Sequence, residues 1–397
     1  MSHAAAALED TSSGGHRTAP VSSKTVLFVV TEDWYFVSHR LPLARAARDA
    51  GYRVVIASRF AEHEALLRHE GFELVPLLLR RRAAGLANEF ASIRELRQLY
   101  RRLRPAVVHH VALKPVVFGT IASWGLDGLG IVNALAGLGY AFTSRGIRAL
   151  SRRIALSAAL AVLLRRRASV TIVQNEEDRD SLKGAIRLGR DRVRLIRGAG
   201  VDLTEFLLTP EADGPPVVLY AGRFLWTKGV GDFVGAAKSL RADGVRARFV
   251  LVGAPDDDNP ESVSREQVDA WVSEGAVEHW GRRTDMPAVL AAAHVVCLPS
   301  RYGEGVPKIL LEAAAGGRAI VTTDWPGCRD AVVDGETGLL VAAGDVSALA
   351  AAIRYLVNDR TRRRQFGEAA RSLAEREFDV KRVVEGTLAC YREVAPR

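Results

Sequence analysis

Short runs of β-branched residues alternate with helical patterns along almost the whole chain, and this alternation limits the possible folds most strongly. In the first half, TVLFVV (25–30), RVVIAS (53–58) and SVTIVQ (169–174) are separated by segments with helical periodicity. Strands that alternate with helices build βαβ units, which form a parallel sheet covered by helices on both faces. The pattern therefore predicts a fold of the α/β class.

The alternation begins again in the second half of the chain. Further strands are predicted at 216–222, 248–253, 294–300 and 319–323. The segment TPEADGPP (209–216), which precedes them, has the composition of a linker. Because 397 residues are too many for one ordinary core, we predict two doubly wound, Rossmann-like domains. Ligands of such sheets bind at the carboxyl ends of the strands, so the site is expected in the cleft between the domains.

The predicted boundaries divide the chain into four segments. Residues 1–24 are rich in Ala, Ser, Thr and Gly and lack the apolar core of a signal peptide, which predicts a disordered leader and a cytoplasmic protein. Residues 25–205 form the N-terminal domain and residues 206–378 the C-terminal domain. Residues 379–397 are predicted to form an amphipathic helix that packs back on the N-terminal domain.

The positive charge is concentrated in the first half of the chain. Residues 1–200 carry 31 Lys and Arg against 17 Asp and Glu, whereas the remainder carries 24 against 29. Basic clusters occur at 80–82, 100–104, 151–153 and 165–167. Each basic side chain near an anionic membrane contributes ~1 kcal/mol, so the clusters together predict a membrane-facing surface. Nucleic acid is less favoured as a partner, because no recognition motif is present.

One apolar segment, IALSAALAVLL (154–164), could be mistaken for a membrane span. A span needs about 20 apolar residues, so this segment is too short. A buried helix is favoured over a helix that dips into the bilayer surface, since short apolar helices usually belong to a core.

The stretch AGRFLWTKG (221–229) places two cations just after a predicted strand. Gly222 ends the strand and allows a ligand to approach the backbone, while Arg223 and Lys228 extend from the loop and the start of the next helix. Arginine offers a planar fork to phosphate oxygens and lysine a mobile point charge. The pair suits a diphosphate, and the alternative is two surface cations that flank a turn.

A second stretch, CLPSRYGEGVPKILLEAAAGG (297–317), adds carboxylates at another strand end. Pro307 is suited to the first turn of a helix, and the backbone N–H groups at a helix start attract anions. Glu304 in the loop and Glu312 in the helix are instead suited to accept hydrogen bonds from hydroxyl groups. Together with Arg223 and Lys228, they describe a site for a nucleotide sugar.

These two stretches resemble the signatures of retaining glycosyltransferases of the GT-B fold, family 4 (group 1). The resemblance covers nearly the whole chain beyond residue 24. DWYFVSHRLPLARAARDAGYRV, VHHVALKPVVFG and GAGVDLTEF are similar to the branch that builds bacterial surface glycans on a polyprenyl-diphosphate carrier. The resemblance implies a GT-B fold with a donor-binding C-terminal domain and an acceptor-side N-terminal domain.

The resemblance also implies roles for individual residues of the C-terminal domain. Arg223 and Lys228 would hold the donor diphosphate and stabilise the leaving group, and Glu312 would bind the ribose. Glu304 would grip hydroxyls of the transferred sugar. The backbone of Gly305 and Val306 would assist Glu304, and Arg282 would contact the base.

On the N-terminal side, the resemblance implies one histidine at the site. It corresponds to His109 or His110, and we prefer His110 for the catalytic set, with His109 on the acceptor side. Lys114 is expected near the donor sugar. The stretch after the first strand lacks the glycine-rich loop of many family members. Its Asp33 and Trp34 are candidates for the acceptor side, and a plain strand–helix turn is the alternative.

The activity that the resemblance implies is transfer of a sugar, with retention, from a nucleotide sugar, with UDP favoured, to a lipid-linked saccharide. No resident cofactor is expected. An Asp-x-Asp pattern in GAPDDDNP (253–260) suggests a metal site, but we interpret it as a solvated loop, because two cations already serve the diphosphate. The protein is expected at the inner face of the plasma membrane. The alternatives are a sugar-nucleotide epimerase of the same fold and an inactive nucleotide-sugar-binding scaffold at the membrane.

Overall fold

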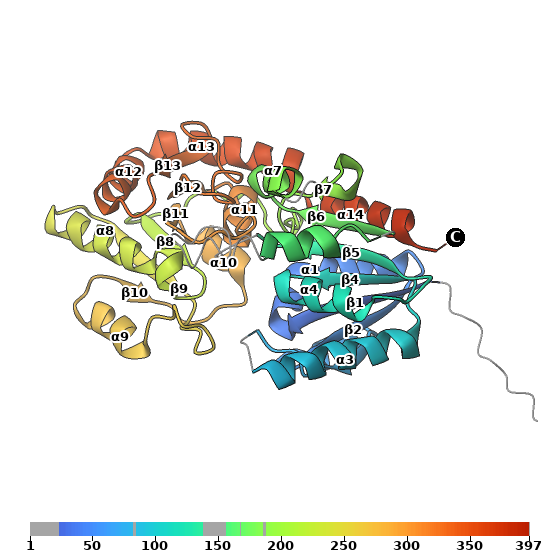
Figure 1. The fold of residues 1–397 in the computed structure, drawn as a ribbon. Coiled ribbons are helices and arrows are strands. Elements are labelled where there is room, and N and C mark those ends of the chain that lie inside the picture. The colour runs from blue at the N-terminus through green and yellow to red at the C-terminus, as the bar shows by residue number, and fades with distance from the viewer. Residues whose placement is uncertain (1–23, 82–84, 138–155, 167, 186–187, 397) are drawn as a thin grey trace, which may run out of the picture.

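The structure is a computed structural model that describes residues 24–81, 85–137, 156–166, 168–185 and 188–396. These residues form two α/β domains, each built on one parallel sheet (Figure 1). The N-terminal sheet consists of β1 (Thr25–Glu32), β2 (Arg53–Arg59), β3 (Glu73–Pro76), β4 (Val107–Val111), β5 (Gly130–Leu135), β6 (Ser169–Val173) and β7 (Val193–Leu195). Their order across the sheet is β3-β2-β1-β4-β5-β6-β7.

The C-terminal sheet repeats this design. It consists of β8 (Val217–Ala221), β9 (Arg248–Val252), β10 (Glu278–His279), β11 (Val295–Leu298), β12 (Ala319–Thr323) and β13 (Gly338–Val341). Their order is β10-β9-β8-β11-β12-β13, so the first strand of each domain lies inside its sheet and the order reverses beside it. The predicted fold of two doubly wound domains is confirmed. β3, β5, β10 and β13 were not predicted.

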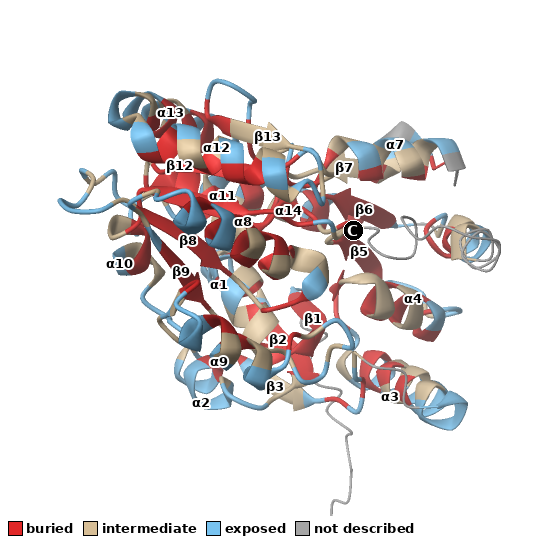
Figure 2. Ribbon diagram, turned by 90° about the vertical axis from the view of Figure 1, so that its left-hand side faces the viewer, coloured by how far each residue is buried: buried red, intermediate tan, exposed pale blue. Residues whose placement is uncertain are grey.

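Helices cover the sheets of both domains. Those of the N-terminal domain are α1 (Asp33–Asp49), α2 (Glu64–His69), α3 (Leu86–Leu103), α4 (Leu113–Ala122) and α7 (Glu176–Ala185). Those of the C-terminal domain are α8 (Val230–Ala242), α9 (Arg265–Ser273), α10 (Met286–Ala291), α11 (Lys308–Ala315), α12 (Val346–Asn358) and α13 (Arg360–Leu373). Figure 2 shows that the strands between these helices are buried almost throughout.

The chain passes between the domains at two adjacent points. Val201, on the way into the C-terminal domain, donates its N–H to the carbonyl of Phe378 at 2.9 Å, and Val380 donates to the carbonyl of Val201 at 3.0 Å. The last helix, α14 (Val380–Val394), then lies against the N-terminal sheet near β5 and β6 (Figure 1). The Tyr391 hydroxyl of α14 is 2.6 Å from His109 Nδ1 in β4.

Several local expectations differ from the structure. α1 begins at Asp33, directly after β1, so the stretch that we considered as a loop is the first turn of a helix. Residues 156–163 of the apolar segment are helical, and Leu160 and Leu164 are buried against neighbouring elements. Within the described ranges, no helix combines the length and apolarity needed to cross a bilayer. Residues 1–23 of the expected leader lie outside the described residues.

Candidate functional site

One predicted cation and one predicted carboxylate, Lys228 and Glu304, meet where β8 and β11 end. These strands are neighbours in a parallel sheet, so the turn after β8 and the loop after β11 lie at the same edge. Lys228 Nζ donates to Glu304 Oε2 at 2.9 Å, and the Ser300 hydroxyl lies 3.3 Å from Glu304 Oε1. Both side chains of this pair are largely buried. The structure thus brings two of the predicted donor-site residues into direct contact.

Arg223 extends from the end of β8 towards the N-terminal domain. Its Nη1 donates to Asp256 Oδ2 at 2.7 Å, and its guanidinium carbon lies 5.7 Å from the centre of a Trp34 ring. Arg81, from the N-terminal domain, donates to the same carboxylate and lies 5.6 Å from the same ring. Trp34 therefore faces two cations, an arrangement in which the ring's negative face attracts the guanidinium groups.

Glu312 lies one turn inside α11, where it is 5% exposed and forms an ion pair with Lys308. Burial raises the pKa of the Glu312 carboxyl, and the charge of Lys308 opposes this shift. Lys308 and Lys228 also both lower the pKa of His39 in α1, after the larger effects of burial and of Arg40. The start of α11 and the turn after β8 therefore face the same part of α1.

A second group in α1 points to the same convergence. Burial raises the pKa of Tyr35, the charge of Glu304 raises it further, and the charge of Arg223 lowers it. Tyr35 stacks on His39 with ring centres 4.1 Å apart. Arg223, Lys228 and Glu304 thus lie near the Tyr35–His39 pair of α1, and Glu312 is linked to this group through its ion pair with Lys308. His39 was not predicted as a site residue.

The two domains are in direct contact beside these residues, and we call this contact region the junction. Gly305, which follows Glu304, donates its backbone N–H to the carbonyl of Ala136 after β5, at 3.1 Å. Arg282 donates to Glu62 of the N-terminal domain at 3.0 Å. Val306 is buried. The Gly305 amide that we expected to bind the sugar is therefore engaged by the other domain in this closed arrangement, and a bound sugar would have to displace that contact.

The preference for His110 as the site histidine is wrong in this structure. Its side chain is fully buried on the α3 and α4 face of the sheet, with Nε2 2.9 Å from the Tyr100 hydroxyl and Nδ1 2.8 Å from Asn133 Oδ1. Burial lowers the pKa of His110 to about 4, so the ring is neutral at pH 7. A substrate has no access to it, and its role is in the core.

His109 points to the opposite face of the sheet, because successive strand residues alternate. It is 1% exposed, stacks on Phe28 and meets Tyr391 of α14. Burial lowers its pKa well below the usual value, with Arg40 and His110 adding to the shift. The expected acceptor-side place of His109 is therefore also wrong, and both histidines are core residues.

Asp33 is likewise structural. It is fully buried, and its carboxylate accepts hydrogen bonds from the backbone N–H groups of Ala61, Glu62 and His63 at 2.8–2.9 Å. Burial raises its pKa, but these hydrogen bonds outweigh burial and lower it overall. Asp33 therefore holds the turn after β2, and its expected contact with an acceptor is wrong.

Lys114 lies at the start of α4, directly after β4 and a one-residue turn. Its Nζ donates to the carbonyl of Arg80 at 2.7 Å and to Glu89 at 2.9 Å. Arg80 belongs to the segment that leads from β3 to α3, which also carries Arg81, and Glu89 lies in the first turn of α3. Lys114 therefore supports the segment that reaches the junction.

The loop GAPDDDNP is not simply solvated. Asp256 is held between Arg81 and Arg223, and Asp258 accepts a hydrogen bond from Arg59 of β2 at 3.3 Å. Arg81 and Asp256 were missed as site residues, because Arg81 belongs to a basic cluster and Asp256 to a stretch that we interpreted as a solvated loop. One signal was available: the loop follows β9, which lies beside β8 and ends at the same edge. Across the described ranges, no three His, Cys, Asp or Glu side chains are grouped to hold a metal ion.

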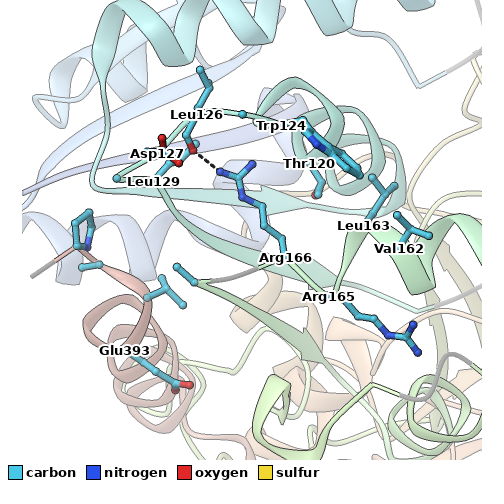
Figure 3. Close-up of a pocket in the computed structure, with 16 residues that line it drawn as sticks. Thr120, Trp124, Leu126, Asp127, Leu129, Val162, Leu163, Arg165, Arg166 and Glu393 are labelled. Carbon is cyan, nitrogen blue, oxygen red and sulfur yellow. Dashed lines mark hydrogen bonds between the residues drawn. The ribbon is translucent and has the colours of Figure 1, made fainter.

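Arg81 and Arg166, which belong to two of the predicted basic clusters, do not share one surface. Arg81 lies at the junction, whereas Arg166 precedes β6 at the opposite edge of the sheet. Arg166 donates to the backbone carbonyl of Ser123 and to that of Leu126, and Figure 3 shows the bond to Leu126. A hollow of about 500 Å³ lies beside Arg166, lined also by Trp124, Val162 and the C-terminal residues 393–396. This hollow is remote from the four donor-site residues and holds none of them. The cluster at 151–153 lies outside the described residues.

Comparison with known proteins agrees with this architecture. Residues 25–175 match the family described as Glycosyl transferase 4-like, and residues 215–359 match Glycosyl transferases group 1. The N,N'-diacetylbacillosaminyl-diphospho-undecaprenol alpha-1,3-N-acetylgalactosaminyltransferase of Campylobacter jejuni is 27% identical over 334 residues, which cover 81% of this chain and 86% of the relative.

Solved structures show the same fold. A glycosyltransferase from Rickettsia africae superposes with a TM-score of 0.75 at 16% identity, over 94% of this chain and 98% of that chain. Anabaena HepE, in complex with UDP-glucose, superposes with a TM-score of 0.73 at 18% identity, over 92% of this chain and 99% of that chain. Both matches extend over the two domains together.

Proposed function

Because the chain belongs to the group 1, family-4-like glycosyltransferases of the GT-B fold, we propose that it transfers a sugar, with retention, from a UDP-linked donor to a lipid-linked saccharide. The observation that carries this proposal is the convergence of Arg223, Lys228 and Glu304 at the carboxyl edge of the C-terminal sheet. The Campylobacter relative, named for a diphospho-undecaprenol acceptor, supports the choice of acceptor, and HepE with UDP-glucose supports the choice of donor.

In the proposed reaction, the bond between the anomeric carbon and the diphosphate oxygen breaks. A bond from the same carbon to an acceptor hydroxyl oxygen forms on the same face, and the hydroxyl proton passes to the departing phosphate. Negative charge builds on the diphosphate as it leaves. Arg223 and Lys228 stabilise that charge, and such preorganised groups are typically worth ~3–4 kcal/mol each in a barrier.

The remaining groups position the donor. Glu312, buried one turn into α11, accepts from the ribose, and Glu304 accepts from the sugar hydroxyls once the donor has displaced its contact with Lys228. Closure of the domains excludes water, which would otherwise hydrolyse the donor. The reaction requires neither a resident cofactor nor a metal, because the two cations supply the charge that the diphosphate needs.

A lipid-linked acceptor places the protein at a membrane, and we propose the inner face of the plasma membrane. Leu78, Leu86 and Phe90 are large apolar side chains that are 67–80% exposed at and near the start of α3. Exposed apolar residues combined with basic ones are typical of surfaces that lie on a bilayer. Arg94 and Arg101 are exposed on the same helix, which makes α3 the proposed point of contact.

The test is an assay with UDP- and GDP-sugars and polyprenyl-diphosphate-linked saccharides. We expect release of UDP together with a longer lipid-linked saccharide, whose new linkage has the anomeric configuration of the donor by NMR. A new sugar nucleotide formed from the donor alone would identify an epimerase instead. Tight binding of nucleotide sugars without transfer to any acceptor would identify a scaffold. An inverted linkage would contradict the retaining mechanism.

A further inference from the structure

Two arginines from different domains share one carboxylate at the junction. Arg81 donates to Asp256 Oδ1 at 2.9 Å and to Oδ2 at 3.2 Å, while Arg223 donates to Oδ2 at 2.7 Å. The Asp256 side chain is 13% exposed, and its backbone N–H donates to the Ser262 hydroxyl at 2.8 Å. The Asp256 carboxylate therefore bridges two guanidinium groups whose like charges would otherwise repel each other.

Arg81 has hydrogen-bonding capacity that the protein itself does not satisfy. Its Nε is buried and lacks a hydrogen-bond partner among the described residues, and the nearest carboxylate oxygen, on Glu32, is 3.7 Å away. A buried donor without a partner costs free energy, so this arrangement favours binding of a further acceptor. A phosphoryl group offers three acceptor oxygens, whereas the Asp256 carboxylate offers two.

The groups around the Asp256 carboxylate fit an anionic ligand that also has a planar face. Trp34 lies beneath both guanidinium groups, with ring centres 5.6 and 5.7 Å from the two guanidinium carbons. Burial raises the pKa of the Tyr302 hydroxyl, whereas the charges of Arg223 and Arg81 lower it, so this side chain borders the same cations. Groups from β1–α1, the segment before α3, the end of β8 and the loop after β11 thus surround the Asp256 carboxylate.

We propose that Arg81 and Arg223 form one phosphoryl-binding site that spans the two domains, and that the Asp256 carboxylate occupies it until a ligand arrives. This inference rests on the proposed function, which it deepens by naming an N-terminal residue that binds the diphosphate. The donor and a polyprenyl-diphosphate-linked acceptor both carry the required group. Binding of either would displace Asp256 and leave Arg81 joined to a ligand that the other domain also holds, which couples binding to domain closure.

The first test measures binding of inorganic pyrophosphate and UDP by calorimetry. Arg81→Ala is expected to weaken pyrophosphate binding by about 10- to 100-fold, because a charge-assisted hydrogen bond is lost. Asp256→Asn is expected to strengthen it several-fold, because the competing anion is removed. Asp258→Asn is the matched control: it lies in the same loop and also pairs across the junction, but with Arg59. It should bind both probes as the wild type does.

The source of the phosphoryl group is separated by two further measurements on Arg81→Ala. If the donor supplies it, UDP binding weakens along with pyrophosphate binding and the KM for the lipid-linked acceptor stays unchanged. If the acceptor supplies it, UDP binding is preserved and the KM for a diphosphate-linked lipid saccharide rises about tenfold or more. Thermal unfolding checks that the variant is folded, which is expected because Arg81 contributes to the junction and not to a core.

The outcomes distinguish this inference from the proposed function. A wild-type protein that transfers sugar, together with an Arg81→Ala variant that matches it in pyrophosphate binding, UDP binding and acceptor KM, overturns the inference alone. Equal behaviour of Asp256→Asn and Asp258→Asn also overturns it. A protein that transfers no sugar but binds pyrophosphate through Arg81 supports the site and contradicts the proposed function.

Discussion

Replacement of Arg223 with alanine is expected to lower the turnover number for sugar transfer by about 10²- to 10³-fold. The guanidinium group lies at the end of β8, where it would meet the diphosphate oxygens on which charge develops. Its hydrogen bond in the structure goes to Asp256, at 2.7 Å, and the side chain is outside both cores. The loss should therefore appear in turnover and in UDP affinity, with little change in the unfolding temperature.

Arg354→Ala serves as the control for Arg223→Ala. Arg354 lies on α12 and forms an exposed ion pair with Asp243, so its replacement also removes an arginine and an ion pair from the C-terminal domain. Exposed ion pairs contribute little to stability, and this variant should behave as the wild type. Near wild-type turnover in Arg223→Ala, with Arg354→Ala also unchanged, would show that Arg223 does not serve the diphosphate.

Replacement of Gly137 with alanine is expected to reduce transfer by at least about tenfold, because misplacement of reacting groups by an ångström can cost more than that. A Cβ at this position would lie 2.6 Å from the carbonyl carbon of Glu304 and 2.7 Å from the nitrogen of Gly305. Both are backbone atoms of the other domain, so the backbone on one side of the junction has to move away from the other. UDP affinity should fall much less than turnover, since most of the contacts proposed for UDP lie within the C-terminal domain.

The control for Gly137→Ala is Gly128→Ala. Both glycines belong to the N-terminal domain and have positive φ, +95° and +71°, so the backbone strain of the two substitutions is similar. No atom lies within 4 Å of a Cβ built at Gly128. Small-angle scattering should show a more open particle for Gly137→Ala only. Equal activity of the two variants would mean that the observed closure has no part in the reaction.

That Lys228 and Glu304 lie close together could be predicted because parallel strands end at a common edge. Once the alternation of strands and helices was recognised, residues that directly follow β8 and β11 had to come together, and Lys228 does contact Glu304. The same reasoning locates Asp256, which follows β9 closely, although its sequence favoured a solvated loop.

The residues that could not be predicted depend on contacts distant in the sequence. Neighbouring strand residues face opposite sides, so one of His109 and His110 had to meet the α14 side, where Tyr391 covers the ring of His109. The α3 side, with Tyr100, covers His110. Arg81 follows β3, which was not predicted, and its cluster gave no indication of its direction. Asp33 was misassigned because α1 begins without an intervening loop.

The most direct test of the central claim is a crystal structure of the protein with a bound nucleotide sugar. We expect diphosphate oxygens at about 2.7–2.9 Å from both the Arg223 guanidinium and Lys228 Nζ, with the ribose at Glu312 and the sugar at Glu304. A nucleotide sugar bound elsewhere, with Lys228 still paired to Glu304 and Arg223 still paired to Asp256, would show that these residues do not form the donor site.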